Sequence, residues 1–192
     1  RGTVNSFYIG FVSTFLATAL GTVAALGLSR PHMPFKGLIM AILISPMIVP
    51  LIITAAGMFF FYSKLGLTHS YTGLILAHTA LGTPFVVITV TATLTGFDNN
   101  LIRASQSLGA DTMRTFFKVI MPLILPGVIS GALFAFITSF DEVVVVLFVG
   151  SVEQVTIPRQ MWAGLRQEIS PVILCMATCL VVLSIALLTT VE

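Results

Sequence analysis

Long stretches without a charge constrain this chain more than any other feature. A hydrocarbon core about 30 Å thick needs about 20 apolar residues in a helix, because each residue advances about 1.5 Å. Residues 7–29, 37–61 and 169–191 contain no titratable side chain that is charged at neutral pH, 65–97 contains only His69 and His78, and 119–150 is interrupted only by Asp141 and Glu142. The sequence therefore predicts about five spanning helices.

Composition agrees with a membrane protein. Of 192 residues, 57% are hydrophobic and 8% are charged, whereas soluble domains carry roughly a quarter charged residues. The apolar runs lack the alternation of β-barrel strands, and backbone groups in lipid must be satisfied within each segment. We predict a single all-α transmembrane domain over 1–192, embedded in a lipid bilayer. Because the chain starts at Arg1 rather than Met, we expect upstream sequence, including a preceding helix, to be missing.

The charged residues predict the orientation. Basic residues favour the cytoplasmic side of short loops. If 30–36 is cytoplasmic, alternation places 98–118 inside and 62–70 and 151–168 outside, so that the inner loops hold the larger share of Lys and Arg. We expect 151–168 to form an extracytoplasmic loop with an interfacial helix. The net charge of +2 and the lack of a basic run do not indicate nucleic acid as a partner.

A charged segment, 98–122, separates two of the apolar runs. Residues 102–108 suit a helix, Gly109 can break it, and Asp111 is a plausible N-cap for a second helix through Lys118. We expect Pro122 and Pro126 to end that helix. From the residues alone, an interfacial loop on lipid headgroups and a docking surface for a soluble partner stay equally open.

The same segment resembles the signature of ABC-importer permeases. That signature reads Glu-Ala-Ala, three residues, Gly, nine residues, an aliphatic residue, one more, and Leu-Pro. Here the positions read Arg103-Ala104-Ser105, Gly109, Val119 and Met121-Pro122. The spacing is preserved, while Arg103 replaces the acid and Met121 the leucine. The resemblance implies that the segment docks on an ATPase subunit through Arg103, Ala104, Ser105, Gly109, Ala110, Asp111, Arg114, Phe117 and Pro122.

Three further stretches resemble the spermidine/putrescine branch of these permeases: 83–87, 139–142 and 158–162. The resemblance implies a type I ABC importer permease fold in a bacterial inner membrane. It also implies a second permease subunit of different sequence, a cytoplasmic ABC ATPase dimer and an extracytoplasmic substrate-binding protein. ATP and Mg would be held by the ATPase, and we expect no cofactor or metal on this chain.

Carboxylates within an apolar run are costly and so are candidates for function. If the helix began near Gly127, Asp141 would lie about 21 Å along it, in the outer half of the membrane. We interpret Thr138, Asp141 and Glu142 as a candidate substrate pathway for a cationic solute. The alternative is that a carboxylate caps a broken helix or pairs with Arg159.

Prolines and a histidine complete the candidates. Pro46, Pro50 and Pro84 lie within apolar runs, and we consider them as helix kinks that serve a gate, although static helices also carry prolines. For His78 a packed, hydrogen-bonded role is favoured over a proton relay.

The sequence contains no phosphate loop, zinc-protease motif or nucleophile triad. We therefore predict a transport subunit rather than an enzyme. An ion-gradient-driven transporter or channel, and a scaffold without transport, stay as alternatives.

Overall fold

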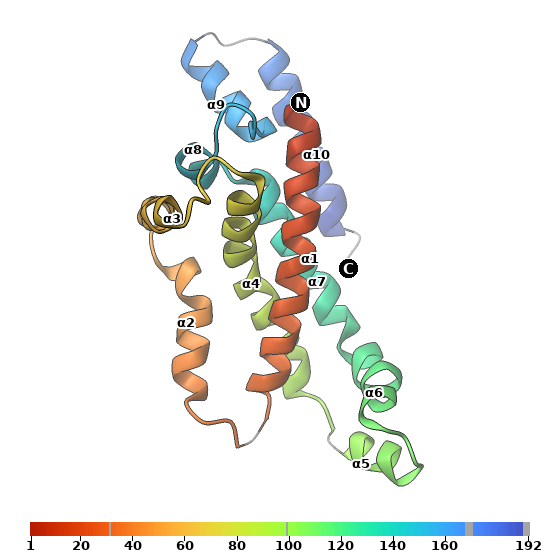
Figure 1. Cartoon of the computed structure of the whole chain (residues 1–192). Coiled ribbons are helices and arrows are strands. Elements are labelled where there is room, and N and C mark those ends of the chain that lie inside the picture. The colour runs from red at the N-terminus through yellow and green to blue at the C-terminus, as the bar shows by residue number, and fades with distance from the viewer. Residues whose placement is uncertain (31, 99, 168–170, 190–192) are drawn as a thin grey trace.

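The structure is a computed structural model that describes residues 1–30, 32–98, 100–167 and 171–189. Within these ranges it contains helices and no strand (Figure 1). The helices, in chain order, are α1 (Gly2–Leu28), α2 (Lys36–Ile48), α3 (Leu51–Leu65), α4 (Tyr71–Thr95), α5 (Asn100–Ser107), α6 (Thr112–Thr115), the π-helix η1 (Phe116–Ile120), α7 (Met121–Asp141), α8 (Val144–Val149), α9 (Ile157–Gln167) and α10 (Pro171–Thr189).

Three long helices form the centre of the molecule. α1, α4 and α7 pack against one another (Figure 1), and the spans Gly2–Leu28, Tyr71–Thr95 and Thr112–Asp141 are long and apolar enough to cross a membrane. The bent pair α2–α3 can count as a fourth span, and Leu174–Leu187 of α10 is a shorter apolar helix. The described residues thus hold three spans, or four with the bent pair, where the sequence predicts about five. The predicted all-α transmembrane fold is confirmed.

Small residues let these three helices approach closely. A β-carbon added at Gly131 of α7 would lie 2.7 Å from the Cα atom of Val86 in α4, and one at Gly82 would lie 3.0 Å from the β-carbon of Ala135. Association of helices in lipid depends on van der Waals packing, because the surrounding chains are as apolar as the helices themselves. The glycines therefore stabilise the centre of the bundle.

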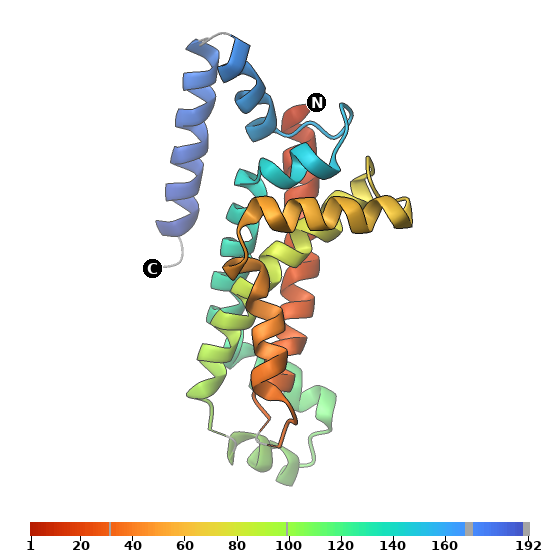
Figure 2. The same cartoon turned by 90° about the vertical axis from the view of Figure 1, so that its left-hand side faces the viewer.

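The second apolar segment differs from the continuous span that the sequence predicts. α2 and α3 meet at a bend of 106°, and α3 runs across the bundle rather than along it (Figure 2). Val49 has extended backbone at the bend and Pro50 precedes α3. This follows from Pro50, because a proline has no N–H for the helix and forces the preceding residue out of the helical region.

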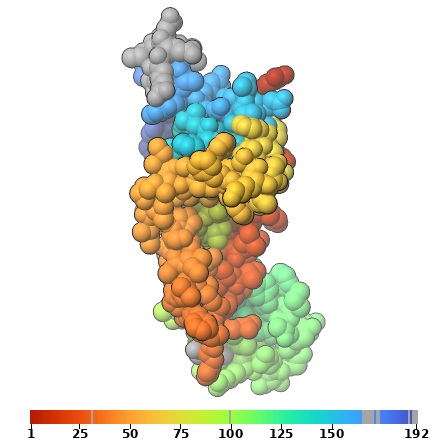
Figure 3. Space-filling view, turned by 60° about the vertical axis from the view of Figure 1, so that its left-hand side comes forward, coloured from red at the N-terminus to blue at the C-terminus, as the bar shows by residue number. Residues whose placement is uncertain are grey.

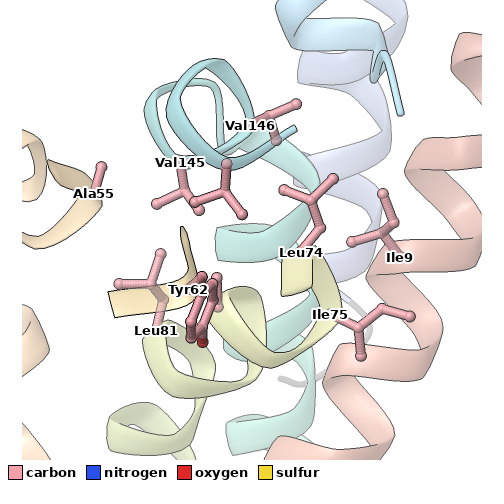
Figure 4. Packing of buried hydrophobic residues seen from close by; sticks show 10 residues of the cluster. Ile9, Ala55, Tyr62, Leu74, Ile75, Leu81, Val145 and Val146 are labelled. Carbon is pink, nitrogen blue, oxygen red and sulfur yellow. The ribbon is translucent and has the colours of Figure 1, made fainter. Parts of the chain in front are cut away.

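Above this bend, α3 and α8 share one apolar cluster with α1 and α4. Val145 and Val146 of α8 lie over Leu74 of α4, and Ile9 of α1 approaches from the side (Figure 4). Tyr62 attaches α3 to the same cluster. Two broken helices are thus anchored to the straight ones at one end of the bundle.

The expectation that Pro122 and Pro126 end a short helix is wrong. Residues Thr112–Asp141 form one continuous helical span, in which the π-turn η1 leads into α7 and Pro122 lies in the first turn of α7. Pro126 also lies inside α7, and a helix in a membrane tolerates proline where a local π-turn re-satisfies the backbone groups that the proline frees. The helix therefore begins well before Gly127, so the estimated depth of Asp141 rested on a wrong start.

The far end of that apolar run is also broken. α7 ends at Asp141, Glu142 has extended backbone, and α8 begins at Val144. Both candidate carboxylates therefore lie at the junction of two helices rather than within one.

Candidate functional site

The turn between α5 and α6 is fixed by three local features. Gly109 has φ +83°, a conformation that costs other residues strain. The Asp111 carboxylate accepts a hydrogen bond from the Arg114 N–H at 2.7 Å, and the hydroxyls of Ser105 and Thr115 lie 3.0 Å apart. The predicted glycine break and Asp111 N-cap are confirmed.

This turn projects apolar side chains into solvent. Leu108, Met113 and Phe117 are 89%, 65% and 57% exposed, and the segment forms a lobe at the foot of the molecule (Figure 3). A hollow of about 490 Å³ on its outer side is lined by Gly109, Asp111, Met113, Arg114, Phe117 and Lys118. An apolar protrusion with a basic rim suits a groove on a partner protein better than free solvent.

The remaining signature residues lie on both sides of the turn. Arg103 and Ala104 are exposed on α5, Ala110 is half-buried between the helices, and Pro122 is exposed at the start of α7. Of the apolar side chains on this helix, Met113 and Phe117 are exposed, while Phe116 and Ile120 are half-buried and line a separate cavity. The helix thus divides its apolar residues between the exterior and the bundle.

The two carboxylates have different surroundings. Asp141 is exposed, whereas Glu142 is 7% exposed and its Oε1 accepts a hydrogen bond from the Val145 N–H at 2.8 Å. Glu142 therefore caps the first turn of α8, which is the alternative that the sequence left open. Thr138 is half-buried one turn earlier. Contact of Thr138, Asp141 and Glu142 with a substrate stays a prediction.

Arg159 has a different partner from the one considered. Its Nη1 donates to the carbonyl oxygen of Ser151 at 2.6 Å, and burial lowers the pKa of its guanidinium from the ordinary value. This contact folds the outer loop back on α9. A structural role for Arg159 follows.

The three prolines occupy different settings. Pro46 lies inside α2, Pro50 lies at the 106° bend, and Pro84 is buried inside α4. Pro50 alone of the three coincides with the bend between α2 and α3. A gating role for any of them stays a prediction.

Sequence reasoning predicted a hydrogen-bonded His78 but missed its partners. His78 is 1% exposed, with Nδ1 at 2.7 Å from the Ser139 hydroxyl, and Ser139 lies 3.0 Å from the Ser13 hydroxyl. These residues come from α4, α7 and α1. Sequence distance hides such a network, because only the packing of the three helices brings the side chains together.

Asn5 was also missed. Its amide nitrogen donates to the carbonyl oxygens of Glu153 and Val155 at 2.8 and 2.9 Å, and the Tyr71 hydroxyl donates to its oxygen at 2.9 Å. Asn5 thereby fastens the outer loop to α1 and α4. An amide at the end of an apolar helix was the signal that could have found it.

Comparisons with known proteins agree with this architecture. The family of binding-protein-dependent transport system inner membrane components matches residues 17–191. The spermidine/putrescine transport system permease protein PotC of Haemophilus influenzae is 32% identical, over 97% of this chain and 73% of its own length. The putrescine transport system permease protein PotI of Escherichia coli K12 is 29% identical, over 90% of this chain and 64% of its own length.

A solved structure has the same fold. The MetNI methionine ABC transporter in inward facing conformations aligns with a TM-score of 0.79 and 22% identity, covering 100% of this chain and 91% of the matched chain. The likeness establishes the expected ABC importer permease fold. With the family match over most of its length, the chain belongs to the binding-protein-dependent transport system inner membrane components.

Proposed function

We propose that this chain forms part of the membrane pathway of a polyamine importer and receives the energy of ATP hydrolysis through the segment 98–122. The observation that carries the proposal is the rigid α5–α6 turn, which exposes Leu108, Met113 and Phe117 beside Arg114 and Lys118. Exposed apolar side chains on a capped helix are the usual anchors of helix-in-groove recognition. The partner on this side is a cytoplasmic ABC ATPase dimer.

The structure of the turn supports force transfer. α6, η1 and α7 are one helical span, so a displacement of the docked turn moves α7 as a rigid element. α7 in turn packs on α1 and α4. Motion at the ATPase is therefore passed to the centre of the bundle without an intervening loop.

The substrate proposal rests on the relatives and on charge. The relatives are permeases for spermidine and putrescine by name, and Asp141 offers an exposed carboxylate at the end of α7 away from the α5–α6 turn. A carboxylate near a pathway attracts a cationic amine and disfavours anions. Glu142 is occupied by α8, so Asp141 is the carboxylate assigned to the substrate.

The remaining partners follow the family. A second permease subunit of different sequence completes the pathway, and an extracytoplasmic substrate-binding protein delivers the polyamine to the end that carries 151–168. The exposed apolar side chains along α1, α2 and α3 are available to lipid and to the second permease.

Uptake by the reconstituted complex tests this function. Proteoliposomes containing this chain, its ATPase, its second permease and the binding protein should accumulate radiolabelled putrescine or spermidine only with ATP inside. Asp141→Asn should raise the half-saturating concentration about two- to fivefold, the range of an exposed charge contact. Lys36→Gln, which removes an exposed charge at the first residue of α2, is the control and should match wild type. Uptake driven by an ion gradient without the ATPase would instead support a secondary transporter.

A further inference from the structure

A second cavity adjoins the α5–α6 turn and shares no lining residue with the hollow beside Gly109. It has a volume of about 320 Å³ and opens where the ends of α1 and α4 meet α5, α6 and η1. Leu26, Leu94 and Ile120 form an apolar wall, and Arg30 and Gln106 lie on its lining as polar groups. The cavity is therefore amphipathic, and its size is that of a small-molecule site.

The charged side chain that lines this cavity is basic. Arg30 is exposed and lines this cavity, and it also lines an adjoining hollow of about 530 Å³ to which His32 contributes. Among the described residues that line the two spaces there is no carboxylate. A ligand that pairs with Arg30 is consequently anionic, and one that covers Leu26 and Leu94 is apolar at its other end.

The cavity lies at the ends of two helices that are long and apolar enough to cross a membrane. Arg30 follows the end of α1 at Leu28, and Leu94 lies in the last turn of α4, so the lining crosses from the hydrocarbon to the water side of the membrane. Basic side chains at this position meet the phosphates of anionic lipids. We propose that the cavity binds an anionic phospholipid of the adjacent leaflet, with its phosphate on Arg30 and an acyl chain along Leu26, Leu94 and Ile120.

The bound lipid has a structural consequence. Thr112, Thr115, Phe116 and Ile120 bring α6 and η1 into the lining, so a lipid in the cavity braces the turn against the ends of α1 and α4. Regulation of coupling by the lipid rests on the proposed function, whereas binding itself does not. A binding measurement therefore separates the two.

Native mass spectrometry of the full complex tests the site. The complex is incubated with phosphatidylglycerol or with phosphatidylcholine of identical acyl chains, and the amount of each lipid that stays bound is measured. Wild type should retain phosphatidylglycerol preferentially. Arg30→Gln should weaken this retention about fivefold, the effect of one basic contact at a membrane surface. Ile102→Trp, which fills the cavity from α5, should abolish the preferential retention of phosphatidylglycerol. Lys64→Gln, an exposed cation at the other end of the bundle, is the matched control and should leave it unchanged.

Three results would overturn the proposal. The first is equal retention of the two lipids by wild type, and the second is retention by Arg30→Gln equal to that of wild type. The third comes from a photo-crosslinker at Gln106, which should label lipid; labelling of a helix of a partner subunit would mean that protein fills the cavity. Neither readout requires transport, so loss of uptake with normal lipid retention would count against the proposed function alone.

Discussion

His78 Nδ1 and Ser139 Oγ lie 2.7 Å apart and join α4 to α7 at the centre of the bundle. The Ser139 hydroxyl also lies 3.0 Å from the Ser13 hydroxyl, which donates to the Gly10 carbonyl oxygen at 3.2 Å. Ser139 therefore joins a ring nitrogen of α4 to a hydroxyl of α1, since one hydroxyl can donate one hydrogen bond and accept another.

Removal of the Ser139 hydroxyl should therefore destabilise the protein. Ser139→Ala leaves the buried Nδ1 of His78 without its hydrogen-bond partner, at a cost of about 1–3 kcal/mol. Thermal unfolding of the purified complex in detergent should begin at a lower temperature. Thr95→Ala removes an exposed hydroxyl that bonds only within α4 and is the control. Equal melting temperatures for Ser139→Ala and wild type would contradict the network.

The approach of α7 to α4 predicts a second stability difference. Gly131→Ala places a β-carbon 2.7 Å from the Val86 Cα atom, so the two backbones must separate, and we expect a loss of about 1–3 kcal/mol. Gly57→Ala in α3 is the matched control, because a β-carbon there meets nothing within 4 Å and alanine is the better helix former. A stable Gly131→Ala protein with an unchanged melting temperature would show that the helices are not held this closely.

The exposed position of Arg103 predicts that reversing its charge has little effect. The side chain is exposed on α5, while the turn is held by Gly109, Asp111 and Thr115. Arg103→Glu should therefore leave co-purification of the ATPase and uptake within about twofold of wild type, since exposed charge contacts contribute little. The same reversal at Arg114, beside the hollow, should weaken co-purification. A large loss of coupling in Arg103→Glu would show that docking depends on this charge.

Local features of the sequence predicted much of the fold. Runs without charge located the apolar segments, and the Gly109 and Asp111 positions located a turn whose backbone and cap need only neighbouring residues. The Pro50 bend was underestimated because its angle depends on the cluster that holds α3 against α8 and α4. The effect of Pro122 was predicted wrongly because a proline commonly ends a helix, whereas here the π-turn η1 directly before it lets the helix continue.

The candidate site was predictable only in part. The signature residues could be located by their spacing. The burial of Glu142 could not be predicted, because it depends on α8, and the sequence predicts the whole apolar run 119–150 as one helix. The polar contacts of His78 and Asn5 join segments far apart in the chain. No periodicity or spacing encodes such contacts, since they arise when separate helices pack.

The most direct test of the central claim is ATP-dependent polyamine uptake by complexes altered at Gly109. Gly109 has φ +83° and open space around it, so substitution acts on the backbone of the turn rather than by a clash. Gly109→Val strains this conformation by about 1–2 kcal/mol, whereas Gly109→Asn tolerates it. We predict that Gly109→Val loses most uptake together with co-purification of the ATPase, while Gly109→Asn retains both. Wild-type uptake by Gly109→Val would contradict coupling through this turn.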